Sequence, residues 1–275
     1  MPDSLSPVVF VGAVTTASDR GLAADLAAAR AAGLAPVPVC TQLTVASRGL
    51  VTDVTDVPSD TVRAQLEHIA ALGTPAAMKI GVLGSAATAT AVLDAAEALD
   101  GPVVLDLVAS GPSGETVLSA DGIDVVADRL GVADLVTVSR QDAELVAGGA
   151  VESLDDAQVA AQRIAARGAR SVLIRCGDLP YRFYDAADDP GADAERLWFD
   201  LFYDGEDFAL YEAPLLPTSP QGTSSVLLAH TVRALLDGTA LEVALQAGKR
   251  AATDAVRFAP DAPPFGLRPA YSTPE

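Results

Sequence analysis

The chain has 275 residues and carries 37 acidic residues against 18 basic ones. Such an acidic balance argues against nucleic acids and anionic membranes as partners. Hydrophobic residues make up 50% of the chain but aromatic residues only 5%, so the core must consist mainly of Ala, Val and Leu, as in helices packed on a parallel sheet. The length suits a single α/β domain that covers residues 1–275.

The sequence has no apolar run near the roughly 18 residues of a membrane span, and its start lacks the basic residues of a secretory signal. We therefore expect a cytoplasmic protein with Cys40 and Cys176 as buried thiols. The acidic residues are scattered, and Lys79 and Lys249 are the only lysines. We interpret this as an acidic coat suited to high salt, and a cationic partner is the alternative.

From Val8 to Arg175, short apolar runs alternate with Ala-rich helical stretches, which predicts repeated βαβ units. Pro36 and Pro38 should place the early part of the second strand at an edge. The β-branched stretch 41–58 is expected as a short strand or flap away from the main sheet. The predicted strands are 8–12, 34–40, 77–81, 103–106, 134–137 and 171–175, and the predicted helices are 21–32, 59–72, 85–99, 119–130, 140–147 and 155–166.

The pattern changes after Arg175. Residues 181–184, 196–203 and 207–211 look like antiparallel strands around an acidic loop, and two helices, 223–236 and 240–257, follow. The sequence therefore predicts an α/β fold whose central sheet is mostly parallel, with some antiparallel strands near the C-terminal third.

Two places in this pattern are candidates for a site. Residues 220–225, Pro-Gln-Gly-Thr-Ser-Ser, begin the first of the late helices, where free N–H groups and the helix dipole favour an anion such as phosphate. The alternative is an ordinary N-cap formed by the hydroxyl groups. Asp106 ends a buried strand, where open α/β sheets bind ligands, or else it caps a loop. The Gly- and Ser-containing loop 109–114 is expected to be mobile and close to such a site.

Taken together, these landmarks resemble the ribokinase-like superfamily, and within it the hydroxymethylpyrimidine and phosphomethylpyrimidine kinases of thiamine biosynthesis. The resemblance covers most of the chain in the family's order. The matching segments are Ala24-Asp25-Leu26, Lys79-Ile80-Gly81, Leu105-Asp106 with Val108 and Ser113-Gly114, the stretch 137–145, Arg175-Cys176-Gly177, and Gly222-Thr223-Ser224-Ser225.

The resemblance implies a three-layer α/β/α fold and a kinase that uses ATP and Mg²⁺ to phosphorylate a small-molecule alcohol, most simply as a homodimer. It implies that Gly222, Thr223, Ser224 and the Ser225 amide form the anion hole, with Ser225 at the position of the catalytic base. Asp106 is the candidate if another carboxylate serves as base. The remaining roles fall on Ser139, Asp142 and Arg175 for the nucleotide, on Asp142 for the metal, and on Ala13, Thr44, Val82 and Val108 for the substrate.

Several of these positions depart from the family's pattern. Ser225 stands where the family has Cys or Asp, and a hydroxyl is a poor general base without an activating neighbour. Ser224 replaces a glycine, Ser139 and Asp142 replace Asn and Glu, and the family's pyrimidine-binding glutamine falls near Ala46. These departures support a second hypothesis, a catalytically impaired kinase fold that binds a nucleotide or small metabolite without phosphotransfer.

Overall fold

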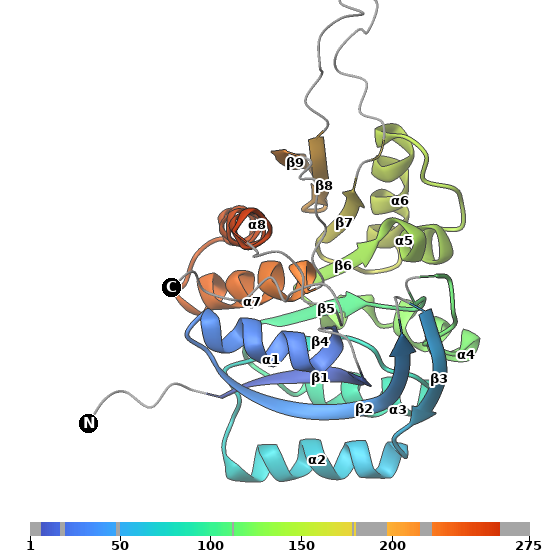
Figure 1. Cartoon of the computed structure of the whole chain (residues 1–275), viewed down its shortest axis with the longest axis vertical. Coiled ribbons are helices and arrows are strands. Elements are labelled where there is room, and N and C mark those ends of the chain that lie inside the picture. Colours follow the sequence, from blue (N-terminus) through green and yellow to red (C-terminus); the bar gives the residue numbers. More distant parts are fainter. Residues whose placement is uncertain are drawn as a thin grey trace, which may run out of the picture.

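The computed structural model describes residues 7–16, 20–47, 50–111, 113–177, 179, 197–214 and 222–258 (Figure 1). The strands are β1 (Pro7–Thr16), β2 (Ala35–Ser47), β3 (Leu50–Asp56), β4 (Ala77–Ile80), β5 (Val103–Leu107), β6 (Leu135–Ser139), β7 (Val172–Gly177), β8 (Leu197–Tyr203) and β9 (Phe208–Pro214). The helices are α1 (Gly21–Ala31), α2 (Ser59–Leu72), α3 (Ala86–Glu97), α4 (Ala120–Ala127), α5 (Arg140–Ala147), α6 (Leu154–Ala166), α7 (Thr223–Leu236) and α8 (Leu241–Arg257), with a 3₁₀ turn at Leu130–Val132.

The described strands form one sheet in the order β3-β2-β1-β4-β5-β6-β7-β8-β9. The pairs from β2 to β7 are parallel. The strand β3 at one edge and the strands β8 and β9 at the other edge pair antiparallel. The predicted mostly parallel sheet with antiparallel strands toward the C-terminus is therefore confirmed.

Helices cover both faces of the sheet (Figure 1). One core cluster joins α1, α7 and α8 to the sheet through side chains such as Leu22, Leu228 and Leu245. The other cluster joins α2 to α6 to the opposite face through side chains such as Val62, Val92 and Ile164. Aliphatic side chains make up nearly all of both clusters, as the composition predicts, and the result is a three-layer α/β/α architecture.

Local sequence explains where several helices begin. Ser85, Ser119, Ser139 and Ser153 each accept a hydrogen bond from the backbone N–H three residues later, so each is an N-cap. The predicted helix 119–130 is shorter than expected, because α4 ends at Ala127 and a 3₁₀ turn follows.

The strand β2 agrees with the prediction made from its prolines. Pro36 and Pro38 pair with β1 on one side, whereas pairing with β3 on the other side begins only at Gln42. The proline nitrogens therefore lie in the part of β2 that is an edge. The stretch 41–58 contains the second half of β2 and the whole of β3, which pair as an antiparallel hairpin. It was expected to lie away from the main sheet, but the hairpin extends that sheet at its edge. The predicted strand 181–184 lies outside the described residues.

Candidate active site

Strand periodicity places a line of polar side chains at one edge of the sheet. Ala77, Val104, Leu135 and Leu173 all belong to the core cluster beneath α1, α7 and α8. Two residues further along each strand stand Lys79, Asp106, Thr137 and Arg175. Since alternate residues of a strand share a face, the four polar side chains point to the same side as the four apolar ones, at the carboxyl ends of β4 to β7.

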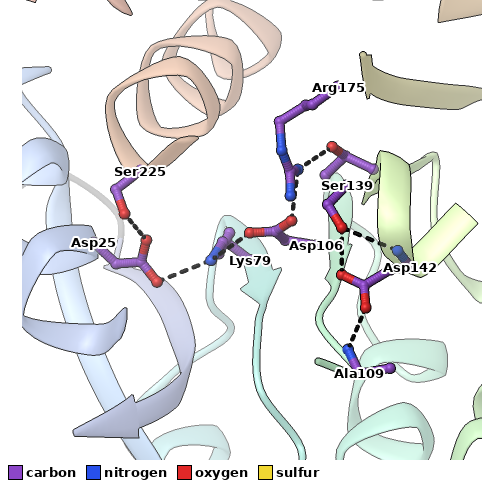
Figure 2. A network of polar contacts seen from close by, with 9 residues as sticks. Asp25, Lys79, Asp106, Ala109, Ser139, Asp142, Arg175 and Ser225 are labelled. Carbon is purple, nitrogen blue, oxygen red and sulfur yellow. Dashed lines mark hydrogen bonds and ion pairs between the residues drawn. The ribbon is translucent and has the colours of Figure 1, made fainter. Parts of the chain in front are cut away.

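These side chains form a continuous polar network with α1 and α7 (Figure 2). Ser225 Oγ donates to Asp25 Oδ1 over 2.6 Å. Lys79 Nζ lies 2.9 Å from Asp25 Oδ2 and 3.5 Å from Asp106 Oδ2. Arg175 Nη1 donates to Asp106 Oδ1 over 2.8 Å. The network therefore links the start of α7 to β7 through two carboxylates and two cations.

Electrostatics favours the charged forms of Asp106 and Lys79 despite their burial. Burial opposes ionisation of Asp106, but the charges of Arg175 and Lys79 outweigh it and lower the pKa of Asp106 below its ordinary value. Burial likewise opposes the charge on Lys79, and the Asp25 and Asp106 carboxylates outweigh it and raise the Lys79 pKa. Each charge in the network is thus stabilised by its partners, and removing one leaves another buried charge uncompensated.

The first turn of α7 has the features of an anion site. Gly222 is the N-cap with φ 87°, a left-handed conformation that favours glycine, and no side chain caps the helix within the described residues. The hydroxyl of Ser225 points instead to Asp25. The Ser225 hydroxyl therefore does not cap the helix. Thr223 and Ser224 lie half-buried in the same turn.

Asp142 lies at the start of α5, beside the network. Its Oδ1 accepts from the backbone N–H groups of Ala109 and Ser110, and its Oδ2 accepts from Ser139 Oγ at 2.8 Å. Burial nevertheless raises the Asp142 pKa above its ordinary value, although the hydrogen bonds and Arg175 oppose the shift. Ser139 is the N-cap of α5, so its side chain is used within the protein, and Asp142 also anchors the loop that follows β5.

The predicted substrate-binding residues occupy the adjacent strand ends. Ala13 and Thr44 are buried on β1 and β2, and Val82 and Val108 are half-buried just after β4 and β5. Thr41 Oγ1 donates to the Val82 carbonyl oxygen over 2.6 Å, which fixes the turn after β4 against β2. All four residues therefore lie at the carboxyl side of the strands, as does the polar network, while no described hydrogen bond joins them to it.

Sequence reasoning assigned no role to Asp25, Lys79 or Gln42. Asp25 and Lys79 are 2% and 4% exposed, and the signal for them was a charged residue within an Ala-rich helix and within an apolar strand. Gln42 is buried beside Ala13 in the β1–β2 register, and its Oε1 has no hydrogen-bond partner among the described residues. The resemblance to the family places its pyrimidine-binding glutamine near Ala46. Gln42 lies on the same strand, four residues earlier.

Two general expectations have a more limited test. The described residues contain no cluster of three or more His, Cys, Asp or Glu side chains that would hold a metal by themselves. Within the same ranges, no helix has the length and apolar character needed to cross a membrane. Cys176 is buried and Cys40 half-buried, and both are free thiols.

Comparison with known proteins places the chain in a family. The phosphomethylpyrimidine kinase family model matches residues 17–267. A hydroxymethylpyrimidine/phosphomethylpyrimidine kinase of Aquifex aeolicus is 30% identical over 78% of this chain and 81% of its own length, and a relative of the same name in Mycobacterium bovis is 28% identical over 94% and 91%.

Solved structures agree on the fold. The pyridoxal kinase of Staphylococcus aureus in complex with AMP-PCP is 23% identical, with a TM-score of 0.82 over 98% of this chain and 94% of that one. Phosphomethylpyrimidine kinase of Clostridium difficile is 21% identical, with a TM-score of 0.72 over 91% and 99%. The ribokinase-like fold expected from the sequence is confirmed, and the chain belongs to the phosphomethylpyrimidine kinase family.

Proposed function

We propose that this protein transfers the terminal phosphoryl group of ATP to the hydroxyl of a hydroxymethylpyrimidine or to the phosphate group of its monophosphate. The observation that carries the proposal is the buried network at the carboxyl ends of β4 to β7, which ends at the first turn of α7, where the N-cap Gly222 has no side chain to cap the helix. Phosphoryl transfer depends mainly on positioning and on neutralisation of charge. The network supplies fixed charges, and the helix start supplies N–H donors.

Two elements are proposed to hold the phosphates. The backbone N–H groups of Gly222, Thr223, Ser224 and Ser225 form an anion hole at the start of α7. Arg175 uses Nη1 for Asp106 and Thr137, so its Nε and Nη2 donors have no hydrogen-bond partner among the described residues. Its side chain is 17% exposed. Arg175 is therefore able to donate to a phosphate while it stays anchored to Asp106.

The residues fit a magnesium ion that is bound mainly by phosphates and water. Asp142 accepts three hydrogen bonds from the protein, which leaves one of its roughly four lone-pair sites for a further partner such as a metal-bound water. When bound, Mg²⁺ supplies charge neutralisation for the phosphate oxygens. We propose that Asp142 orients that hydration shell through water.

The acceptor is proposed to lie against Ala13, Thr44, Val82 and Val108. The small and mostly apolar side chains suit the flat face of a pyrimidine ring. Gln42 is paired with Ala13 in the sheet, and its unpartnered amide oxygen offers a hydrogen bond to a ring amino group. Asp106 lies across the network and remains the candidate base if Ser225 does not serve.

Product formation tests this function directly. Purified protein in high salt is incubated with ATP, Mg²⁺ and either hydroxymethylpyrimidine, its monophosphate or pyridoxal, and products are identified by mass spectrometry. We expect a phosphorylated pyrimidine and stoichiometric ADP. Binding of nucleotide without any phosphorylated acceptor would contradict the proposal and favour the catalytically impaired kinase fold.

We also propose that the protein is a homodimer. Val14, Leu43 and Val45 are 38%, 50% and 48% exposed. Val14 pairs with Leu43 and Thr16 with Val45, so the three apolar side chains share one face of the sheet beside the unpaired edge of β3. A second copy would cover this face, and light scattering would measure the mass of the resulting dimer.

We further propose a cytoplasmic location, which the two free thiols support.

A further inference from the structure

Asp25 belongs to the network, but the proposed function gives it no role of its own. It lies in α1, 2% exposed, and its Oδ1 accepts a 2.6 Å hydrogen bond from Ser225 Oγ, which is 9% exposed in the first turn of α7. The two residues are far apart in the sequence, and the packing of α1 against α7 brings them together. Figure 2 shows the Asp25 carboxylate directed at the Ser225 hydroxyl.

The direction of this hydrogen bond matters for proton transfer. An ionised carboxylate only accepts hydrogen bonds, so the hydroxyl of Ser225 must donate. Its own proton therefore points to Asp25, and the lone pairs of Oγ point elsewhere. A serine held in this way has its lone pairs oriented to accept a hydrogen bond from a third group. In an isolated serine the hydroxyl rotates freely, so its lone pairs have no fixed direction.

Lys79 fixes the other oxygen of the same carboxylate. Its Nζ lies 2.9 Å from Asp25 Oδ2, and it also contacts Asp106 at 3.5 Å. Among the described residues, the charged groups linked to Asp25 by ion pairs are Lys79 from β4 and, beyond it, Asp106 from β5 and Arg175 from β7. The ion pair orients the carboxylate, and Oδ1 is left to face Ser225.

We propose that Asp25 is a positioning residue that makes Ser225 a proton relay, so that the pair replaces the Cys or Asp that related kinases have at position 225. The inference rests on the proposed function. In the step, the acceptor oxygen forms a bond to the terminal phosphorus of ATP as the bond from that phosphorus to the ADP oxygen breaks. The acceptor's proton passes to Ser225 Oγ, the Ser225 proton passes to Asp25 Oδ1, and ADP leaves with the electron pair.

The test uses Asp25→Asn, Ser225→Asp and the combination of both in the full chain. Asp25→Asn should lower kcat for the pyrimidine about 100-fold, the usual contribution of a general base, with KM for the acceptor nearly unchanged. Ser225→Asp puts a carboxylate directly at the relay position. The double variant should therefore have a kcat at least tenfold higher than that of Asp25→Asn. If Asp25 only held a structural ion pair with Lys79, adding Ser225→Asp would not restore kcat.

Asp200→Asn is the matched control. Asp200 is also 2% exposed and also pairs with a buried lysine, since its Oδ2 lies 2.8 Å from Lys249 Nζ. The control should lose stability in the same way and keep kcat within about threefold. The charge of Asp200 also acts on Arg175, so Asp200→Asn can itself lower kcat. This makes the difference between the two variants smaller, and the test is therefore a strict one.

A second readout needs no ligand. The free energies of unfolding of Ser225→Ala, Asp25→Ala and the double variant should be non-additive, with the double variant losing less than the sum, because both single changes remove the same hydrogen bond. Additive losses would show that this hydrogen bond does not form in solution and would overturn the proposal.

The kinetic outcomes separate the two levels of the account. If the natural protein is active and Asp25→Asn costs no more than Asp200→Asn, the role of Asp25 is overturned while the proposed function stands. If the natural protein is inactive and Ser225→Asp is active, the relay is also overturned, since Asp25 would not make Ser225 competent. If neither transfers phosphate to any pyrimidine, the proposed function fails and the relay fails with it.

Discussion

At the scale of single residues, the candidate site consists of charged side chains that are buried, which is unusual for their type. Asp106 and Ser225 were predicted because Asp106 ends a strand and Ser225 begins a helix, whereas Asp142 and Arg175 were predicted from the resemblance to the kinase family. Neither led to a role for Asp25, because a residue inside a helix carries no sign of what lies across from it. The contact between Asp25 and Ser225 depends on how two helices distant in sequence pack, and local pattern contains no information on that.

The pH dependence of stability tests the state of Asp106. Its lowered pKa means that the ionised carboxylate stabilises the fold above the ordinary pKa of about 4 and that this contribution is lost as pH falls below it. Asp106→Asn removes the partner of two buried cations and should cost about 3 kcal/mol or more at pH 7. Urea unfolding should show this difference shrinking below pH 4. A difference that stays constant down to pH 3 would mean that Asp106 is not ionised in the native protein.

At the scale of helices and strands, periodicity was sufficient for most of the fold. The βαβ alternation and the edge position of Pro36 and Pro38 follow from local rules, and the structure confirms them. The position of the hairpin of β2 and β3 could not be predicted, because β-branched residues favour a strand without specifying its partner. The hairpin extends the sheet and leaves apolar side chains exposed at its edge.

The proposed dimer predicts how this hairpin responds to charge. Leu43→Glu combined with Val45→Glu should convert the protein to a monomer in light scattering, because two carboxylates on each copy would be buried against each other. Leu72→Glu, at a 77% exposed position of α2, adds a carboxylate away from this face, so it is the control and should leave the mass unchanged. A monomeric natural protein, or a double variant that stays dimeric, would show that this face is not the interface.

At the scale of the whole molecule, charge is distributed in a way that no single element shows. The formal net charge is −19, and the chain's two lysines are 4% and 7% exposed and bound to buried aspartates. The outer surface therefore owes its positive charge to arginine. The charge imbalance can be counted from the composition, whereas the burial of the two lysines depends on tertiary packing and could not be predicted from local pattern.

Self-repulsion of this surface predicts a rise of stability with salt. Raising NaCl from 0.1 to 1 M shortens the Debye length from about 10 to about 3 Å, so Tm should increase by several degrees. A matched concentration of sucrose separates screening from general exclusion effects, because it stabilises without screening. A Tm that falls or stays constant in NaCl would favour an acidic surface kept for a cationic partner.

We expect the carboxyl edge of the sheet to bind nucleotide although several of its residues differ from the family's pattern. Calorimetric titration with AMP-PCP and Mg²⁺ in high salt measures this binding, with Arg175→Met as the site variant and Arg170→Met as the control. Arg170 precedes the same strand, at its other end, and is 64% exposed. We expect micromolar binding, on the order of −8 kcal/mol, weakened roughly tenfold or more by Arg175→Met and unchanged by Arg170→Met. No heat of binding to the folded natural protein would contradict the account.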